Sequence, residues 1–151
     1  MTVVYIDADA CPVREEVYRV AGRFRVEVSV VSNGSRPIRP THLPFVRMVV
    51  VGEKADAADD WIAERITSSD ICVSADIPLA SRCLAKGARV VPPNGRPLTT
   101  ANIGNALAGR EISRHLRELG QSGKGTLPFT KADRSRFLSA LDTAVRAALR
   151  G

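Results

Sequence analysis

The sequence predicts a three-layer α/β/α fold with a mainly parallel central sheet of about five strands and additional C-terminal helices. Strand-like and helix-like segments alternate along residues 1–93. The strand-like segments are continuous apolar runs, as expected for parallel strands that are buried on both faces. A chain of 151 residues has the length of one domain. We therefore expect a single domain over residues 1–151, with an α/β core at 1–93 and a basic helical part at 94–151.

The expected elements follow from apolar runs, helical spacing and turn residues. Five apolar runs, at residues 3–6, 26–31, 45–51, 71–73 and 90–91, are the expected strands. Apolar residues at helical spacing predict helices that open at Pro12, Asp56 and Pro78. The same spacing predicts two more helices, one containing residues 103–119 and one containing residues 137–149.

Charge is divided unevenly along the chain. The formal net charge is +6. Residues 1–76 carry 9 basic and 12 acidic side chains (net −3), whereas residues 77–151 carry 13 basic and 4 acidic ones (net +9). Such a division is expected if one part holds a cation and the other a phosphate backbone. Aromatic residues make up only 5% of the chain, which argues against sequence-specific recognition of single-stranded bases.

Cysteine usage and hydropathy indicate a cytoplasmic protein without a membrane partner. Cys11, Cys72 and Cys83 share no metal-ligand spacing, so we expect them to be small buried hydrophobes in a reducing compartment. No apolar stretch approaches the 18 or more residues of a membrane span, and the N-terminus lacks the apolar core of a signal peptide.

Several aspartates stand where an open α/β sheet binds ligands, beyond the carboxyl ends of its strands. Asp7 and Asp9 follow the first expected strand, Asp76 follows the fourth, and Asp56, Asp59 and Asp60 open the helix between the third and the fourth. Carboxylates gathered at one edge would repel one another unless a cation neutralised them. Hard oxygen ligands favour Mg²⁺ or Mn²⁺, which suit phosphodiester hydrolysis. Helix capping is the alternative explanation for Asp56 and Asp76.

These aspartates divide into two overlapping sets of candidate residues. The candidate metal ligands are Asp7, Asp59, Asp60 and Asp76, with the choice between Asp59 and Asp60 open. The candidate catalytic residues are Asp7, Asp9, Asp59 and Asp76.

The candidate groups for phosphate binding are mostly basic. Their charge or amide donors are of the kind that contacts a nucleic-acid backbone. They are Asn33, Arg82, Lys86, Arg96, Arg110, Arg114 and Arg117, the last three forming a stripe at helical spacing.

The segments 5–13 (YIDADACPV), 55–62 (ADAADDWI) and 74–80 (SADIPLA) together resemble the bacterial YaiI/YqxD family, as do 95–99 (GRPLT), 128–129, 133–134 and 137–138. The resemblance covers almost the whole chain. That family is grouped with PIN-like domains, which are often metal-dependent nucleases acting on RNA. The resemblance implies a PIN-like fold whose acids correspond to Asp7, to Asp59 or Asp60, and to Asp76. Only Glu15 or Glu16 corresponds to a further acid that such domains place on an early helix.

Two other functions use the same residues. In haloacid dehalogenase phosphatases, Asp-X-Asp after the first strand supplies a nucleophile, here Asp7, and Lys54 or Lys86 would be the lysine. Pro12 starts a helix at once and leaves no room for the flap of those enzymes. The other function is a non-catalytic RNA-binding module. We expect a metal-dependent ribonuclease with Mg²⁺ or Mn²⁺ as cofactor and RNA as partner.

Overall fold

The computed structural model describes residues 1–8, 11–34, 38–54, 56–105 and 129–151. Within these ranges the chain forms a five-stranded, all-parallel sheet in the order β3-β2-β1-β4-β5. The strands are β1 (Val3–Asp7), β2 (Glu27–Ser32), β3 (Val46–Val50), β4 (Ile71–Val73) and β5 (Arg89–Val90). The helices are α1 (Arg14–Phe24), α2 (Ala57–Arg65), α3 (Ile77–Ala85) and α5 (Lys131–Arg150).

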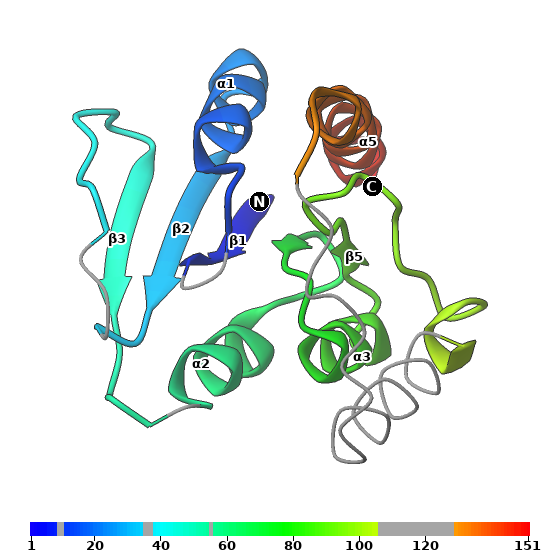
Figure 1. Cartoon of the computed structure of the whole chain (residues 1–151), viewed down its shortest axis with the longest axis horizontal. Coiled ribbons are helices and arrows are strands. Elements are labelled where there is room, and N and C mark those ends of the chain that lie inside the picture. The colour runs from blue at the N-terminus through cyan, green and yellow to red at the C-terminus, as the bar shows by residue number, and fades with distance from the viewer. Residues whose placement is uncertain (9–10, 35–37, 55, 106–128) are drawn as a thin grey trace.

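Helices cover both faces of the sheet, which confirms the predicted three-layer α/β/α fold. Figure 1 shows α1 and α5 on one face and α2 and α3 on the other. The side chains of successive β1 residues pack alternately against the two helical layers, because neighbouring side chains of a strand point to opposite faces of the sheet. Val4 and Ile6 pack in the core under α1 and α5, whereas Tyr5 packs in the core under α2 and α3.

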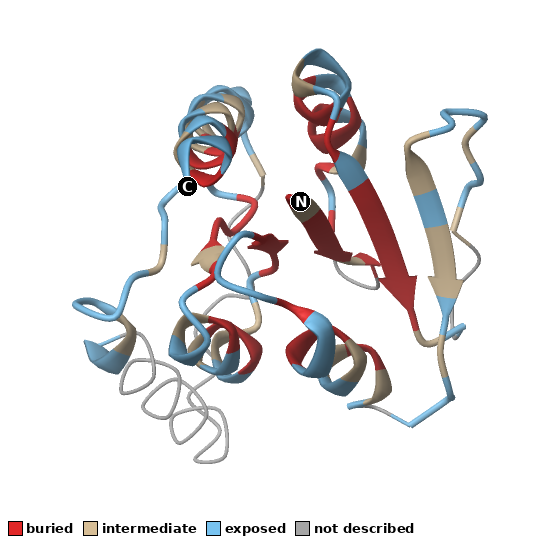
Figure 2. Cartoon of the chain, turned by 180° about the vertical axis from the view of Figure 1, so that it is seen from behind, coloured by how far each residue is buried: buried red, intermediate tan, exposed pale blue. Residues whose placement is uncertain are grey.

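Burial follows the strand order. The central strands β1 and β2 are largely buried, whereas the edge strand β3 contains only half-buried and exposed residues (Figure 2). No described residue of the connection between β2 and β3 is helical. Helices therefore cover β3 less completely than they cover β1 and β2.

The C-terminal helix α5 belongs to the same core as the first strands. Phe137, Leu141 and Val145 are fully buried in the cluster that contains β1 and α1. A capping box starts the helix: the Asp133 N–H donates to Thr130 Oγ1 (3.1 Å), and the Thr130 N–H donates to Asp133 Oδ2 (3.0 Å). Helix α5 thus contributes directly to the core that β1 and α1 begin.

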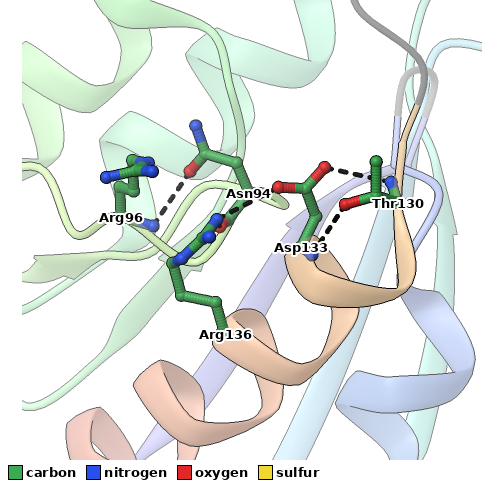
Figure 3. A network of polar contacts seen from close by, with 5 residues as sticks. All are labelled: Asn94, Arg96, Thr130, Asp133 and Arg136. Carbon is green, nitrogen blue, oxygen red and sulfur yellow. Dashed lines mark hydrogen bonds and ion pairs between the residues drawn. The ribbon is translucent and has the colours of Figure 1, made fainter.

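A polar network fastens the start of α5 to the loop that follows β5 (Figure 3). Arg136 donates to the Asn94 carbonyl (3.1 Å) and pairs with Asp133 (3.0 Å). The Asn94 side chain in turn accepts from the Arg96 N–H (2.9 Å). Gly95 lies against the helix backbone with a φ of 76°, in the left-handed region that favours glycine.

The five predicted strands are confirmed, as are the helices expected from Pro12, Asp56 and Pro78 and the one containing residues 137–149. No strand end differs from the predicted run by more than one residue. The differences arise because backbone pairing defines a strand: the polar residues Asp7, Ser32 and Arg89 are paired in the sheet although they lie outside the apolar runs. Of the helix expected at 103–119, residues 103–105 are helical, and residues from 106 onward lie outside the described ranges. None of the helices in the described ranges combines the length and apolarity that a membrane crossing requires.

The close approach of Gly95 to α5 predicts a large effect of Gly95→Ala on stability. A Cβ at this position would lie 2.4 Å from Arg136 C and Phe137 N, both backbone atoms that cannot move aside separately. Strain and overpacking together should lower the free energy of unfolding by about 2–4 kcal/mol, measured by urea denaturation. Gly52→Ala is the control, since nothing lies within 4 Å of its Cβ position. Equal stability of the two variants would contradict the proposed anchoring of α5.

Candidate functional site

The centre of the sheet brings two of the predicted acids to one edge. β1 pairs with both β2 and β4, so the strand order reverses beside β1. Asp7 is the last residue of β1, and Asp76 follows β4 as the N-cap of α3. Crevices at such a reversal are the usual ligand sites of open α/β sheets.

Ser74 connects these two acids. Its hydroxyl donates to Asp7 Oδ2 (3.2 Å) and accepts from the Asp76 N–H (3.0 Å). Ser74 is buried, with 3% of its surface exposed. Ser74 is not among the residues predicted from the sequence, although a serine directly after a strand and two residues before an N-cap aspartate is a recognisable pattern.

Asp76 is held by its own helix. Its Oδ1 accepts from the Leu79 N–H (2.9 Å), and Pro78 stands at the start of α3. This confirms the capping role that the sequence offered as an alternative for Asp76. Capping occupies one carboxylate oxygen, and the helix N-terminus stabilises the negative charge of the group.

Asp59 is the third acid at this edge. It is half-buried in the first turn of α2. Burial, the negative charges of Asp76 and Asp7, and a hydrogen bond with Asp76 raise the pKa of Asp59 from 3.8 to about 7. Asp56 adds a smaller electrostatic contribution. Three carboxylates from three separate segments therefore interact, and one of them holds a proton near neutral pH.

Asp60 makes a different contact. It is exposed, and its Oδ1 pairs with Arg82 Nη1 at 2.6 Å, joining α2 to α3. Of the two adjacent aspartates, Asp59 is the one that interacts with Asp76 and Asp7. Lys86 makes a second link between the same helices, because its Nζ donates to the Glu64 carbonyl (3.1 Å).

The remaining candidates lie in several places. Asn33 follows β2 and is half-buried, and Arg96 is exposed in the loop after β5. Glu16, the possible counterpart of a further PIN-like acid, is buried and pairs with Arg134 of α5 at 2.5 Å, whereas Glu15 is exposed. The candidates Asp9, Arg110, Arg114 and Arg117 lie outside the described residues.

A cavity of about 350 Å³ lies between the start of α3 and the loop that follows β5. The two neighbours of Asp76, Ala75 and Ile77, form one side, and the loop residues Asn94 and Arg96 form part of the other. Within the described part of the chain, no side chain pairs with the Arg96 guanidinium. The loop is held rigidly by the network in Figure 3, so Arg96 extends from a fixed backbone.

The carboxylates match a hard divalent cation in their chemistry. Among the residues that the structure describes, no three Asp, Glu, His or Cys side chains are placed to hold a metal ion. Asp76 is engaged with Leu79 and Asp59, and Asp60 is engaged with Arg82. Oxygen donors that repel one another are the donor set that Mg²⁺ or Mn²⁺ prefers.

The cysteines have the packing role expected of them. Cys11, Cys72 and Cys83 are free and buried. Burial raises the pKa of Cys11 to about 11, and the Asp7 charge acts in the same direction. Cys11 is therefore a thiol at neutral pH and does not act as a nucleophile beside the acids.

Comparison with known proteins places the chain in a family. The model described as "Uncharacterized BCR, YaiI/YqxD family" matches residues 5–147. The UPF0178 protein of Paramagnetospirillum magneticum is 55% identical over 150 residues, covering 99% of this chain and 98% of the relative. The UPF0178 protein of Rhodospirillum centenum is 55% identical over 155 residues, covering 100% and 99%. No solved structure matches significantly. The chain therefore belongs to the YaiI/YqxD family, to which its sequence motifs point.

Proposed function

We propose that the protein is a divalent-cation-dependent ribonuclease whose site consists of Asp7, Asp59 and Asp76. The observation that carries this proposal is the meeting of three acids at one edge of the sheet: Ser74 contacts both Asp7 and the Asp76 backbone, and Asp59 shares a hydrogen bond with Asp76. Burial and the charges of Asp76 and Asp7 raise the pKa of Asp59 to about 7, in agreement with this arrangement. Asp59 shares a hydrogen bond with Asp76 and meets its negative charge, whereas the adjacent Asp60 pairs with Arg82. Strongly shifted groups in a cleft are typical of functional sites.

Mg²⁺ or Mn²⁺ fits this site best, and Asp7, Asp59 and Asp76 are the residues that would hold it. Such an ion activates water and stabilises the charge on the leaving oxygen of a phosphodiester. The chain itself fixes the position of the acids: Ser74 holds Asp7, and α3 holds Asp76. Asp59 would have to give up its proton to hold a cation, so cation binding would be linked to proton release.

RNA is the proposed substrate because its backbone matches the groups around the acids. Arg96 lines the cavity between the start of α3 and the loop that follows β5, and it offers a charge to a phosphate next to the bond that is cut. The net charge of +9 over residues 77–151 supports binding of a polyanion at low specificity. The PIN-like grouping of the family agrees with a nuclease acting on RNA.

The shifted pKa of Asp59 predicts a pH dependence of stability in the absence of metal. The pKa is about 7 in the folded protein and near 3.9 when unfolded, so the folded state binds the extra proton between these values. The contribution of Asp59 to the free energy of unfolding is therefore fully present below about pH 4, and it is lost as the pH rises to about 7. In urea denaturation with EDTA present, the free energy of unfolding should fall less between pH 5 and 8 for Asp59→Asn than for the wild type.

Asp60→Asn is the matched control for this experiment, since the neighbouring carboxylate is exposed and paired with Arg82. The free energy of unfolding of Asp60→Asn should fall with pH as steeply as that of the wild type. Added Mn²⁺ should stabilise the wild type more at pH 8 than at pH 6, because the cation competes with the proton. The same slope in Asp59→Asn as in the wild type would contradict the coupling of Asp59 to its neighbours.

Substitution of Asp7 separates catalysis from binding. Asp7→Asn should lower Mn²⁺-dependent cleavage of a mixed RNA pool by at least about a hundredfold, because it removes a cation ligand from the site. RNA affinity, measured by fluorescence anisotropy, should stay equal or rise, since a negative charge has been removed. Asp60→Asn should retain cleavage.

Two results would point to the alternative functions. Wild-type protein that binds the RNA pool with Mn²⁺ but leaves it uncut would show a binding module without catalysis. A phosphoryl group trapped on Asp7 after incubation with a phosphate monoester would show a phosphatase that uses Asp7 as nucleophile. Either result would contradict the ribonuclease.

Arg96→Gln tests the position of the substrate. Loss of one charged contact to a phosphate should raise KM for RNA cleavage roughly tenfold and change kcat less, because the contact exists before and during the reaction. Arg150→Gln, an exposed arginine at the end of α5, is the control and should leave both constants unchanged. Equal KM values for Arg96→Gln and the wild type would show that Arg96 does not contact the RNA.

A further inference from the structure

Two of the three cysteines pack together between the sheet and helix α3. Cys72 is the middle residue of β4, and Cys83 lies in the last turn of α3. Both are fully buried in the cluster that α2 and α3 cover, whereas Cys11 belongs to the cluster on the other face of the sheet. Cys72 and Cys83 are therefore the two thiols that share one environment.

Strand geometry directs the Cys72 side chain towards α3. Its neighbours Ile71 and Val73 belong to the cluster under α1 and α5, because successive side chains of a strand point to opposite faces of the sheet. Cys83 lies on the buried face of α3, together with Leu79. The two thiols share a hydrogen bond, so their sulfur atoms are in contact. Side chains that already meet in this way are the starting point for a disulfide, whereas side chains that point apart cannot be joined without backbone movement.

The backbones of the two cysteines are attached to the same short segment. The Val91 N–H donates to the Cys72 carbonyl (2.9 Å), and the Ala88 N–H donates to the Cys83 carbonyl (3.1 Å). Residues 88–91 include β5, which pairs with β4. These contacts limit how far the two sulfur atoms can separate in the folded protein.

Cys83 is the thiol that ionises first. Its hydrogen bond with Cys72 and the positive charges of Arg82 and Lys86 lower the pKa of Cys83, although burial acts in the opposite direction. The same hydrogen bond, together with burial, raises the pKa of Cys72. The thiolate is the form that attacks an oxidant, so Cys83 is the attacking group. Its place in the last turn of a nine-residue helix allows access, because helix ends open more readily than the centre of a sheet.

A bond between the two sulfurs would restrain the segment beside the acids. Ser74 and Asp76 lie between the two cysteines in the sequence, so the bond would close a loop that contains both residues. Ser74 contacts Asp7, and Asp76 caps α3. The negative charge of Asp59 acts on both thiols, which places the pair near the same edge of the sheet. Oxidation of the pair would therefore tie β4 to α3 on either side of the residues that position the acids.

We propose that Cys72 and Cys83 are an oxidation site at which a small hydroperoxide forms a reversible disulfide. The Cys83 sulfur attacks one oxygen of hydrogen peroxide, the O–O bond breaks, and the other oxygen leaves as water with the proton of the thiol. The Cys72 sulfur then attacks the resulting sulfenic acid of Cys83, the S–O bond breaks, and a second water leaves with the proton of Cys72. The two thiols lose two electrons and the peroxide gains them, and a dithiol reverses the change by exchange.

Tryptic mapping tests this proposal directly, because Arg82 separates the two cysteines. Trypsin places Cys72 in peptide 66–82, Cys83 in peptide 83–86 and Cys11 in peptide 1–14. The full-length protein is treated with hydrogen peroxide without denaturant, so that the pair must meet in the folded state. Remaining thiols are then blocked with N-ethylmaleimide in urea, and the unreduced digest is analysed by mass spectrometry. We expect peptides 66–82 and 83–86 to be joined, Cys11 to be blocked, and dithiothreitol to release the two peptides.

The closed loop should also stabilise the oxidised protein. The urea midpoint of the wild type should rise by roughly 1 M after peroxide treatment and return with dithiothreitol. Cys11→Ser is the matched control and should show the same cross-link and the same rise. Cys83→Ser should show neither, and Cys72→Ser should instead leave a sulfenic acid on Cys83 that dimedone labels.

Three results would overturn the proposal. They are a cross-link that involves Cys11, a disulfide only between two molecules, and thiols of Cys72 and Cys83 that stay reduced in peroxide while Cys11 is oxidised or all three remain intact. The proposal does not rest on the ribonuclease activity, so an RNA pool that remains uncut would leave these results unchanged.

Discussion

The parallel pairing of β1 with β4 determines where this molecule gathers its acids. In that register Ile6 lies opposite Val73, so the next residues, Asp7 and Ser74, leave the sheet side by side. The Ser74 hydroxyl then contacts both Asp7 and the Asp76 backbone. Because α1 and α3 depart to opposite faces of the sheet, the edge between them stays open, and the first turn of α2 brings Asp59 to it (Figure 1).

Buried Asp70 and half-buried Asp59 have opposite electrostatic surroundings. Asp70, 3% exposed, accepts hydrogen bonds from the backbone of Val3 and from Thr67, and so fixes the start of β1. Asp59 instead faces the negative charges of Asp76 and Asp7, and a proton keeps it neutral up to about pH 7. Repulsion between carboxylates lowers the stability of the folded protein, and a bound cation would offset this repulsion.

Local pattern was enough to predict the strands, the helices and the edge where Asp7 and Asp76 meet. Contacts between distant segments were not predictable. Asp59 and Asp60 are adjacent on α2, and only the position of Arg82 on α3 separates their roles. Register, which aligns Tyr5, Ser29 and Arg47, is a property of the folded sheet.

The central claim is that Asp7, Asp59 and Asp76 form one cation site, and a crystal structure of the protein with Mn²⁺ at pH 8 tests it most directly. The account predicts anomalous density for one or two ions bound by oxygens of these three carboxylates, at about 2.0–2.4 Å. It also predicts that Asp59 exchanges its hydrogen bond with Asp76 for the ion. An Asp59–Asp76 hydrogen bond that persists at saturating Mn²⁺, with no ion at this edge, would contradict it.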